Sequence, residues 1–187
     1  MSLDILIGPM FAGKSSRILD IVARNAAIDT PVIVIKHIAD VRYSLENEVV
    51  THDNRRCACL RVSDLDDIPP NVRDRHSVFI VEEAQFFRNL VPFCEHLVDT
   101  LGKRVYLIGL DGDSNRRPFG EILQCIPLAD SVEKLQAFCR RCRDGTPALF
   151  TWRNSSVREQ TLVGGQERYE ALCRACYIRQ LTGGVEQ

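Results

Sequence analysis

The sequence predicts an α/β protein in which a parallel sheet surrounds a phosphate-binding loop and a small cysteine-bounded unit follows. Three observations support this fold class. Residues 8–15 fit the pattern G-x-x-x-x-G-K-[ST], which cradles phosphates. Apolar, strand-like runs alternate with helix-like segments as far as residue 135. Two Cys-x-x-Cys pairs stand close to the carboxyl-terminal end.

The first element is a buried strand at residues 3–7, which breaks at Gly8. Gly8 and Gly13 allow backbone angles that turn successive N–H groups toward phosphates, and the helix that follows points its positive end at the same anion. Lys14 supplies a positive charge for the terminal phosphates, and the Ser15 hydroxyl can ligate magnesium. An ordinary glycine-containing turn can match by chance, but the flanking strand and helix favour binding of a nucleoside triphosphate.

The remaining elements of the sheet follow in order. The helix after the loop carries an apolar stripe that includes Ile18 and Val22. Further strands are predicted at residues 32–35, 57–62, 77–81, 105–110 and 132–135. A helix is predicted at residues 90–101 and closed by Gly102. Residues 36–47 are polar and are interpreted as a loop, and the two prolines at 69–70 as a break.

Two adjacent acids, Glu82 and Glu83, end the strand predicted at residues 77–81. Enzymes with a phosphate-binding loop use a carboxylate on a neighbouring strand to hold magnesium or its waters, and a residue that activates the nucleophile. Two carboxylates this close should repel each other, and magnesium would relieve the repulsion. We therefore expect one acid to serve the metal and the other the nucleophile. Solvated surface glutamates are the alternative.

The paired cysteines, Cys139, Cys142, Cys173 and Cys176, match the ligand set of a tetrahedral zinc site. No ligand position is left open, so the predicted metal is structural. The long gap between the pairs predicts a hairpin-like excursion with arms at residues 147–151 and 159–163. Chance pairs of buried cysteines and a redox pair are the alternatives. The other cysteines lie in or beside apolar runs and are predicted to be small buried hydrophobes: Cys57, Cys59, Cys94 and Cys125.

Composition narrows the function classes. The chain has 187 residues, which suits one domain or one domain with a small appendage. Its 24 basic and 25 acidic residues give a net charge of −1, which argues against a general nucleic-acid or membrane-surface binder. No apolar run is long enough to span a bilayer, and we expect no signal peptide. Binding of a nucleoside triphosphate points to a reducing compartment, so we expect a cytoplasmic protein.

The ordered motifs resemble those of the cytosolic-type (type II) thymidine kinases of animals, many bacteria and large DNA viruses. The shared pieces are residues 8–15, 40–43, 51–53, 83–87, 110–112 and 117–120, the four paired cysteines, and Gly164-Gly165 with Tyr169. The resemblance implies a RecA-like P-loop domain at residues 1–137. It also implies a small zinc-ribbon domain at residues 138–187, whose loop, the lasso, closes over the nucleoside. A homotetramer is the implied assembly.

The resemblance also assigns roles to individual residues. Glu83 matches the general base that takes the proton from the ribose 5′-hydroxyl. Residues matching the ATP site are Gly8, Pro9, Met10, Phe11, Ala12, Gly13, Lys14 and Ser15, with Asp40, Val41, Arg42, Glu82 and Gln85 beside them. Ser15 and Glu82 would hold magnesium, directly or through water. Residues matching the nucleoside pocket are Met10, Phe86, Leu110, Ser114, Phe119, Thr151 and Tyr169, and backbone groups of Gln160, Thr161, Leu162, Val163 and Gly164 would read the thymine edge and the sugar.

Four positions depart from the family pattern. Ala12 stands where serine is usual, Glu82 replaces aspartate, Ser114 replaces phenylalanine and Trp152 replaces lysine. The longer Glu82 side chain changes the reach toward magnesium. Loss of the aromatic at Ser114 predicts a roomier nucleoside pocket, unless Trp152 or Phe119 fills the space.

The function implied by the resemblance is ATP-dependent phosphorylation of thymidine to thymidine monophosphate, a nucleotide-salvage step that supports DNA synthesis. Thymidine triphosphate is the implied feedback inhibitor. A broader deoxynucleoside kinase, a P-loop zinc-ribbon ATPase acting on nucleic acid, and an inactive binding protein are the alternatives. The neutral charge and the lack of a basic, aromatic-interleaved face argue against a nucleic-acid partner. We expect no membrane partner.

Overall fold

The computed structural model describes residues 1–39, 48–50, 55–154, 160 and 167–183 of the chain. Among these residues, no helix is both long enough and apolar enough to cross a membrane.

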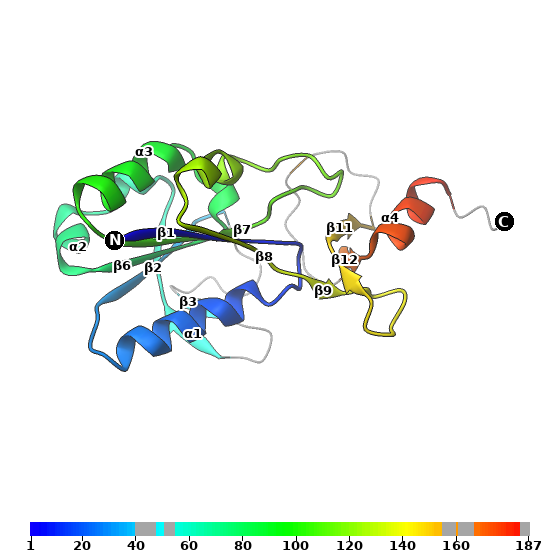
Figure 1. Ribbon diagram of the computed structural model, residues 1–187, viewed down its shortest axis with the longest axis horizontal. Helices are drawn as coiled ribbons and strands as arrows, with labels where there is room; N and C mark the ends of the chain where they lie inside the picture. Colours follow the sequence, from blue (N-terminus) through cyan, green and yellow to red (C-terminus); the bar gives the residue numbers. More distant parts are fainter. Residues whose placement is uncertain (40–47, 51–54, 155–159, 161–166, 184–187) are drawn as a thin grey trace.

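A six-stranded parallel sheet forms the centre of the molecule (Figure 1). Its strand order is β5-β2-β6-β7-β1-β8, and every neighbouring pair runs parallel. The strands are β1 (Ser2–Ile7), β2 (Val32–His37), β5 (Leu60–Val62), β6 (Val78–Glu82), β7 (Arg104–Gly109) and β8 (Ser131–Lys134). This confirms the predicted fold class. Because parallel strands end at a common edge, residues that follow β1, β6 and β7 meet there.

Both faces of the sheet are covered, so its strands are apolar on both sides. In β6, Phe79 and Val81 join the larger core, whereas Val78 and Ile80 join the core on the opposite face. Helix α1 (Lys14–Ala26) and the hairpin of β3 (Glu48–Val50) and β4 (Arg56–Ala58) lie on the second face (Figure 1). The first face carries α2 (Pro70–Arg75), α3 (Leu90–Glu95) with its π-helical extension (His96–Thr100), and 3₁₀ turns at Leu65–Asp67, Ala84–Phe86 and Ile122–Leu128.

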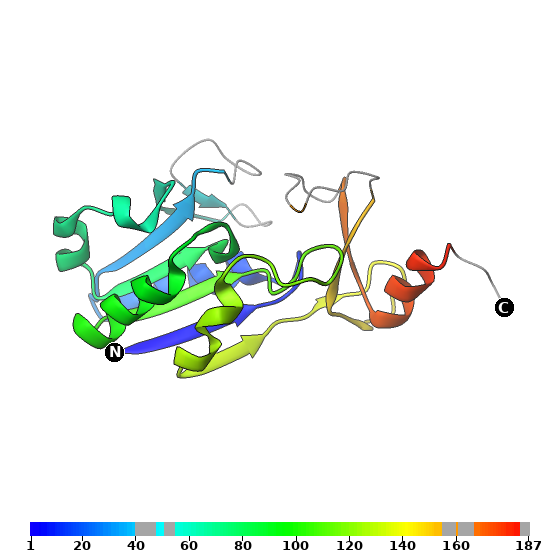
Figure 2. The ribbon, with the colours of Figure 1, turned by 90° about the horizontal axis from the view of Figure 1, so that it is seen from above.

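A second group of elements lies beyond the carboxyl-terminal edge of the sheet (Figures 1 and 2). It contains two antiparallel pairs, β9 (Ala137–Phe138) with β10 (Pro147–Ala148) and β11 (Phe150–Arg153) with β12 (Tyr169–Leu172), followed by α4 (Arg174–Leu181). This group has its own core, which includes Leu172, Tyr177 and three of the paired cysteines. We call it the cysteine unit.

The structure corrects several element boundaries. The strand predicted at residues 57–62 is two strands: β4 pairs with β3, and β5 joins the main sheet. Strand β2 continues to His37, so Lys36 lies in the sheet and not in a loop. The two prolines interpreted as a break begin a helix, because a proline in the first turn loses no hydrogen bond.

The first predicted arm of the excursion, residues 147–151, is also corrected, because it divides between β10 and β11. Strand β11 pairs with β12. Of the second predicted arm, residues 159–163, only Gln160 belongs to the described residues. The local sequence does not identify the partner strand of β11, because the pairing depends on how the two cysteine pairs come together in the fold.

Candidate active site

The phosphate-binding loop connects β1 to α1 at the carboxyl-terminal edge of the sheet. Gly8 has a φ of 153°, and a Cβ atom there would lie 2.6 Å from the carbonyl oxygen of Leu135. Only glycine lets the segment after β8 pass this close. Lys14 Nζ donates to the carbonyl oxygens of Gly8 (3.1 Å) and Pro9 (2.7 Å). The lysine head therefore lies over the loop, where a phosphate group would need its charge.

Glu82 ends β6 beside this loop. The Ser15 hydroxyl donates to Glu82 Oε1 at 3.1 Å, and Lys36 Nζ lies 4.0 Å from Glu82 Oε2. Lys36 faces Glu82 directly in the β2–β6 register, and the side chains of both are almost fully buried. Lys36 was not predicted as a site residue, because the last two residues of β2 are polar and continue directly into the polar stretch that follows. A lysine that closes an apolar strand beside a strand ending in acids was the available signal.

Glu83 has very different surroundings, although it follows Glu82 directly. Its backbone is left-handed, with φ 52° and ψ 45°, which is uncommon for a residue that is not glycine. Only 9% of Glu83 is exposed. The side-chain amide of Gln85 donates to Glu83 Oε2, and its oxygen accepts from the backbone N–H of Leu110 at 2.9 Å. Gln85 thus ties Glu83 to the residue that follows β7.

Most of the residues predicted for the nucleoside pocket come together in one apolar cluster. Its buried members are Met10, Leu110, Phe119 and Tyr169, and Phe11 and Phe86 pack against them. The rings of Phe86 and Phe119 meet edge to face at 5.6 Å. The buried Thr151 hydroxyl accepts from the Met10 N–H at 3.0 Å, which ties the phosphate-binding loop to β11. The cluster stands between that loop and the cysteine unit.

The other residues singled out in the sequence lie outside the apolar cluster or outside the described part of the chain. Ser114 is half-buried, and its carbonyl oxygen accepts from the Tyr177 hydroxyl at 2.6 Å. Trp152 packs edge to face on Tyr177 at 5.3 Å, in the core of the cysteine unit. The Gln160 side chain donates to Asp113 Oδ2 (3.1 Å) and to the carbonyl oxygen of Pro118 (3.3 Å). Outside the described residues lie Asp40, Val41, Arg42, Thr161, Leu162, Val163 and Gly164.

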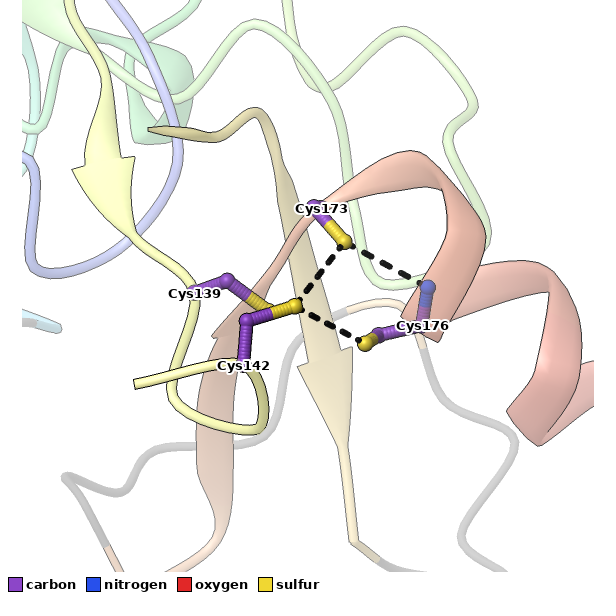
Figure 3. A group of neighbouring side chains, drawn as sticks. All are labelled: Cys139, Cys142, Cys173 and Cys176. Carbon is purple, nitrogen blue, oxygen red and sulfur yellow. Dashed lines mark hydrogen bonds between the residues drawn. The ribbon is translucent and has the colours of Figure 1, made fainter. Parts of the chain in front are cut away.

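The four paired cysteines converge in the cysteine unit (Figure 3). All four sulfur atoms lie within 4.8 Å of one another, and Cys142 Sγ lies 3.8 Å from Cys173 Sγ and 3.5 Å from Cys176 Sγ. A tetrahedral zinc with Zn–S bonds of about 2.3 Å needs sulfur–sulfur distances of about 3.8 Å. The sulfur positions therefore fit a closed metal site.

The thiols of the chain differ in how readily they ionise. Burial opposes ionisation of Cys139, but backbone N–H groups of Cys173, Cys142 and Arg141 outweigh it and lower the Cys139 pKa to about 6. A thiolate is the form that binds metal. By contrast, burial raises the pKa of Cys57 and of Cys59 to about 11. These two thiols therefore stay protonated; Cys59 is buried, as predicted, whereas Cys57 is half-buried.

Taken together, the carboxyl-terminal edge of the sheet holds a phosphate cradle, a buried carboxylate beside a serine hydroxyl, and a second carboxylate held in place by an amide. This arrangement suits transfer of a phosphoryl group to a hydroxyl. Sequence reasoning did not identify Lys36, Asp113, Arg116 or Tyr177 as parts of this region. For Tyr177, the signal was its position immediately after Cys176.

A family model and several known proteins that resemble this chain all carry the name thymidine kinase. The family model described as Thymidine kinase matches residues 1–177. The thymidine kinase of myxoma virus (strain Lausanne) is 37% identical over 176 residues, covering 94% of this chain and 96% of the viral protein. The human protein named "Thymidine kinase, cytosolic" is 36% identical over 181 residues, covering 97% of this chain and 75% of its own length. A rice thymidine kinase is 40% identical, covering 94% of this chain and 66% of its own.

Proposed function

Because this chain belongs to the thymidine kinase family and phosphorylates thymidine, we propose that Glu83 is the base that takes the proton from the ribose 5′-hydroxyl. The family uses ATP, and residues 8–15 form the site for its phosphates. The observation that carries this proposal is the anchoring of Glu83 by Gln85 at the edge where the phosphate loop also lies. A general base must be held within hydrogen-bond reach of its proton, and Gln85 limits the positions that the carboxylate can take.

Magnesium is the second element of the proposal. Oxygen donors of Ser15 and Glu82 lie together beside the phosphate loop, and such donors suit this hard cation. When bound, magnesium neutralises charge on the phosphates. The buried Lys36 ammonium lies 4.0 Å from Glu82 Oε2 and limits the positions that the longer Glu82 side chain can take. Gln85 acts in this proposal through Glu83, and residues 40–42 extend the nucleotide site.

The thymine base occupies the apolar cluster in our proposal. Met10, Phe86, Leu110, Phe119 and Tyr169 enclose its faces, Thr151 fixes the loop, and Ser114 leaves the wall with one aromatic fewer than the family pattern. Backbone groups of residues 160–164 read the thymine edge and the sugar. A broader deoxynucleoside specificity is the second candidate, because Ser114 leaves this wall without the aromatic side chain of the family pattern.

We further propose that the metal in the cysteine unit is zinc with a structural role. Four convergent thiols leave no open ligand position, and their spacing supports a tetrahedral ion. Residues 1–137 then form the P-loop domain and residues 138–187 the zinc-ribbon lasso domain. A homotetramer and a cytoplasmic location complete the proposal; relatives from human and cattle carry the word "cytosolic" in their names.

Feedback inhibition by thymidine triphosphate, which the family resemblance implies, is a further part of the proposal. Its base would occupy the apolar cluster and its phosphates the loop at residues 8–15, because the two sites are joined through Met10. We expect competition with thymidine in steady-state kinetics. Inhibition that does not compete with thymidine would require a separate regulatory site.

The experiment that tests the proposed function is ATP turnover by the purified chain with and without thymidine, with the phosphorylated product identified. We expect turnover only when the nucleoside is present. Deoxycytidine and deoxyuridine measure the breadth of specificity, and single-stranded DNA tests the ATPase alternative. ATP hydrolysis that rises with DNA and ignores thymidine would overturn the proposal.

A further inference from the structure

A tight loop at residues 111–118 connects β7 to the apolar cluster. Its two flanking residues, Leu110 and Phe119, are both buried members of that cluster. Within the loop, Gly112 bridges to Pro118, and the Asp113 carboxylate accepts from two backbone N–H groups of the loop at 2.8 and 2.9 Å. The loop is therefore internally stiff, and a displacement of it would move Leu110 and Phe119, which belong to the proposed nucleoside pocket.

The outer side of this loop is held by the cysteine unit through two contacts. The Tyr177 hydroxyl donates to the Ser114 carbonyl oxygen at 2.6 Å. The Arg116 guanidinium lies over the Tyr177 ring, 4.5 Å from its centroid, and 5.5 Å from the centroid of Phe150. Arg116 takes a left-handed backbone, with φ 62°, to reach this place. A strained backbone persists only where surrounding contacts hold it.

Tyr177 is itself held firmly. Only 1% of the residue is exposed, and Phe150 and Trp152 pack against its ring at 5.4 and 5.3 Å. The preceding residue, Cys176, is one of the four thiols of the metal site. The ring position is thus set by the metal-binding end of α4 and by β11.

We propose that Tyr177 and Arg116 are positioning residues that couple the cysteine unit to the nucleoside pocket and thereby set the affinity for thymidine. The proposal rests on the proposed function, because it assumes that the apolar cluster receives the base. A planar guanidinium on an aromatic ring and a hydroxyl on a carbonyl together restrain both translation and rotation of the loop. The cysteine unit then affects substrate affinity although its sulfur atoms do not line the apolar cluster.

The first test is Tyr177→Phe, which removes one oxygen atom and keeps the ring. We expect the KM for thymidine to rise roughly 3- to 10-fold, the effect of losing one partly buried hydrogen bond. The kcat and the KM for ATP should stay within about twofold of the original values, because the phosphate loop is not touched. Arg116→Lys keeps the charge and loses the planar stack, and should act in the same direction.

Coupling is measured with the double variant. Because Tyr177 and Arg116 restrain the same loop, the combined rise in the KM for thymidine should be smaller than the product of the two single effects. Tyr106→Phe is the matched control. Tyr106 lies on β7 and packs against the core beneath α1, so this variant should have unchanged KM values for thymidine and ATP. Metal content and thermal unfolding of each variant report whether the cysteine unit stays intact.

A spectroscopic signal separates positioning from general stability. Trp152 is the only tryptophan of the chain and touches Tyr177. Its fluorescence should change when thymidine binds the original protein, and Tyr177→Phe should shift the thymidine titration to higher concentration while metal content is unchanged. An unchanged thymidine KM in both single variants, or a fall in kcat with an unchanged KM, would overturn this proposal. Failure of the proposed function differs: the unaltered protein itself would not phosphorylate thymidine.

Discussion

The two acids at the end of β6 have separate surroundings because the backbone turns between them. Glu82 still belongs to the strand and faces Lys36 and Ser15, whereas Glu83 adopts a left-handed conformation and faces Gln85. The two adjacent carboxylates therefore have different partners. In the proposed function, this separation lets Glu82 serve the magnesium ion and Glu83 the 5′-hydroxyl.

Replacing Glu83 by Gln keeps size and polarity but removes the proton acceptor. We expect kcat to fall roughly 10²- to 10⁴-fold, with ATP binding retained. Steady-state kinetics and ATP titration measure the two effects. Glu133→Gln is the control, since Glu133 is an exposed acid on edge strand β8 and should leave turnover unchanged. Near-normal turnover of the Glu83 variant would reject Glu83 as the base.

Lys36→Met tests the buried ion pair. Removing the ammonium leaves the Glu82 carboxylate buried beside an apolar side chain, and we expect the free energy of unfolding to fall by about 3–5 kcal/mol. The control is Lys134→Met, which breaks the shorter but partly exposed contact between Lys134 and Asp111 (2.6 Å). That change should cost about 1 kcal/mol or less. Equal losses for both variants in urea denaturation would contradict this account.

At the scale of elements, the site depends on close packing between the segments that follow β6 and β7. Gly120 follows the 111–118 loop, with φ 61°, and a Cβ atom there would lie 2.1 Å from the carbonyl oxygen of Gln85. The same Gln85 holds Glu83 and the Leu110 N–H. The Glu83 carboxylate and the apolar cluster therefore both depend on the position of Gln85.

Gly120→Ala should disturb both the Glu83 carboxylate and the apolar cluster. We expect a loss of about 2–5 kcal/mol in unfolding free energy, from left-handed strain and the collision together, and a fall in kcat as Gln85 is displaced. Gly102→Ala is the matched control because Gly102 also has a positive φ (64°) but no atom within 4 Å of the added Cβ. It should lose only about 1–2 kcal/mol and keep full kcat. An unaltered kcat in Gly120→Ala would show that Gln85 is not displaced.

At the scale of the whole molecule, the cysteine unit and the sheet are joined through Met10–Thr151 and through Tyr177–Ser114. Both joints connect β11 or α4 to segments at the carboxyl-terminal edge of the sheet. Loss of the metal site should therefore weaken substrate binding as well as local folding.

Cys173→Ser removes one of the four thiolates. We expect metal content to fall below one ion per chain, the Tm to drop and thymidine phosphorylation to be lost, because metal binding and folding of the unit are linked. Metal analysis and calorimetry provide the measurements. Cys57→Ser, at a half-buried thiol outside the metal site, should keep the metal. A Cys173→Ser protein with full metal content and an unchanged Tm would contradict a structural metal.

Much of the fold was predictable because the strongest signals are local. The apolar runs of β1, β6 and β7 and the glycine-rich loop each lie within about ten residues, and hydrophobic periodicity reports such elements well. The boundaries of β4, β5 and α2 were less accessible. The boundaries of β4 and β5 depend on the strands with which they pair. The start of α2 depends on the fact that proline is tolerated in the first turn of a helix.

The sequence by itself determined the family, the phosphate loop, the two acids and the four thiols, since each is a short pattern whose chemistry requires those residue types. Tertiary structure decided which partner each acid has, that Lys36 is buried against Glu82, and that Tyr177 and Arg116 contact the loop beside the apolar cluster. These contacts join residues far apart in the chain, and Tyr177 alone lies 63 positions from Ser114. A side chain's partner across such a distance depends on how the sheet, the loop and the cysteine unit pack together, which no local pattern records.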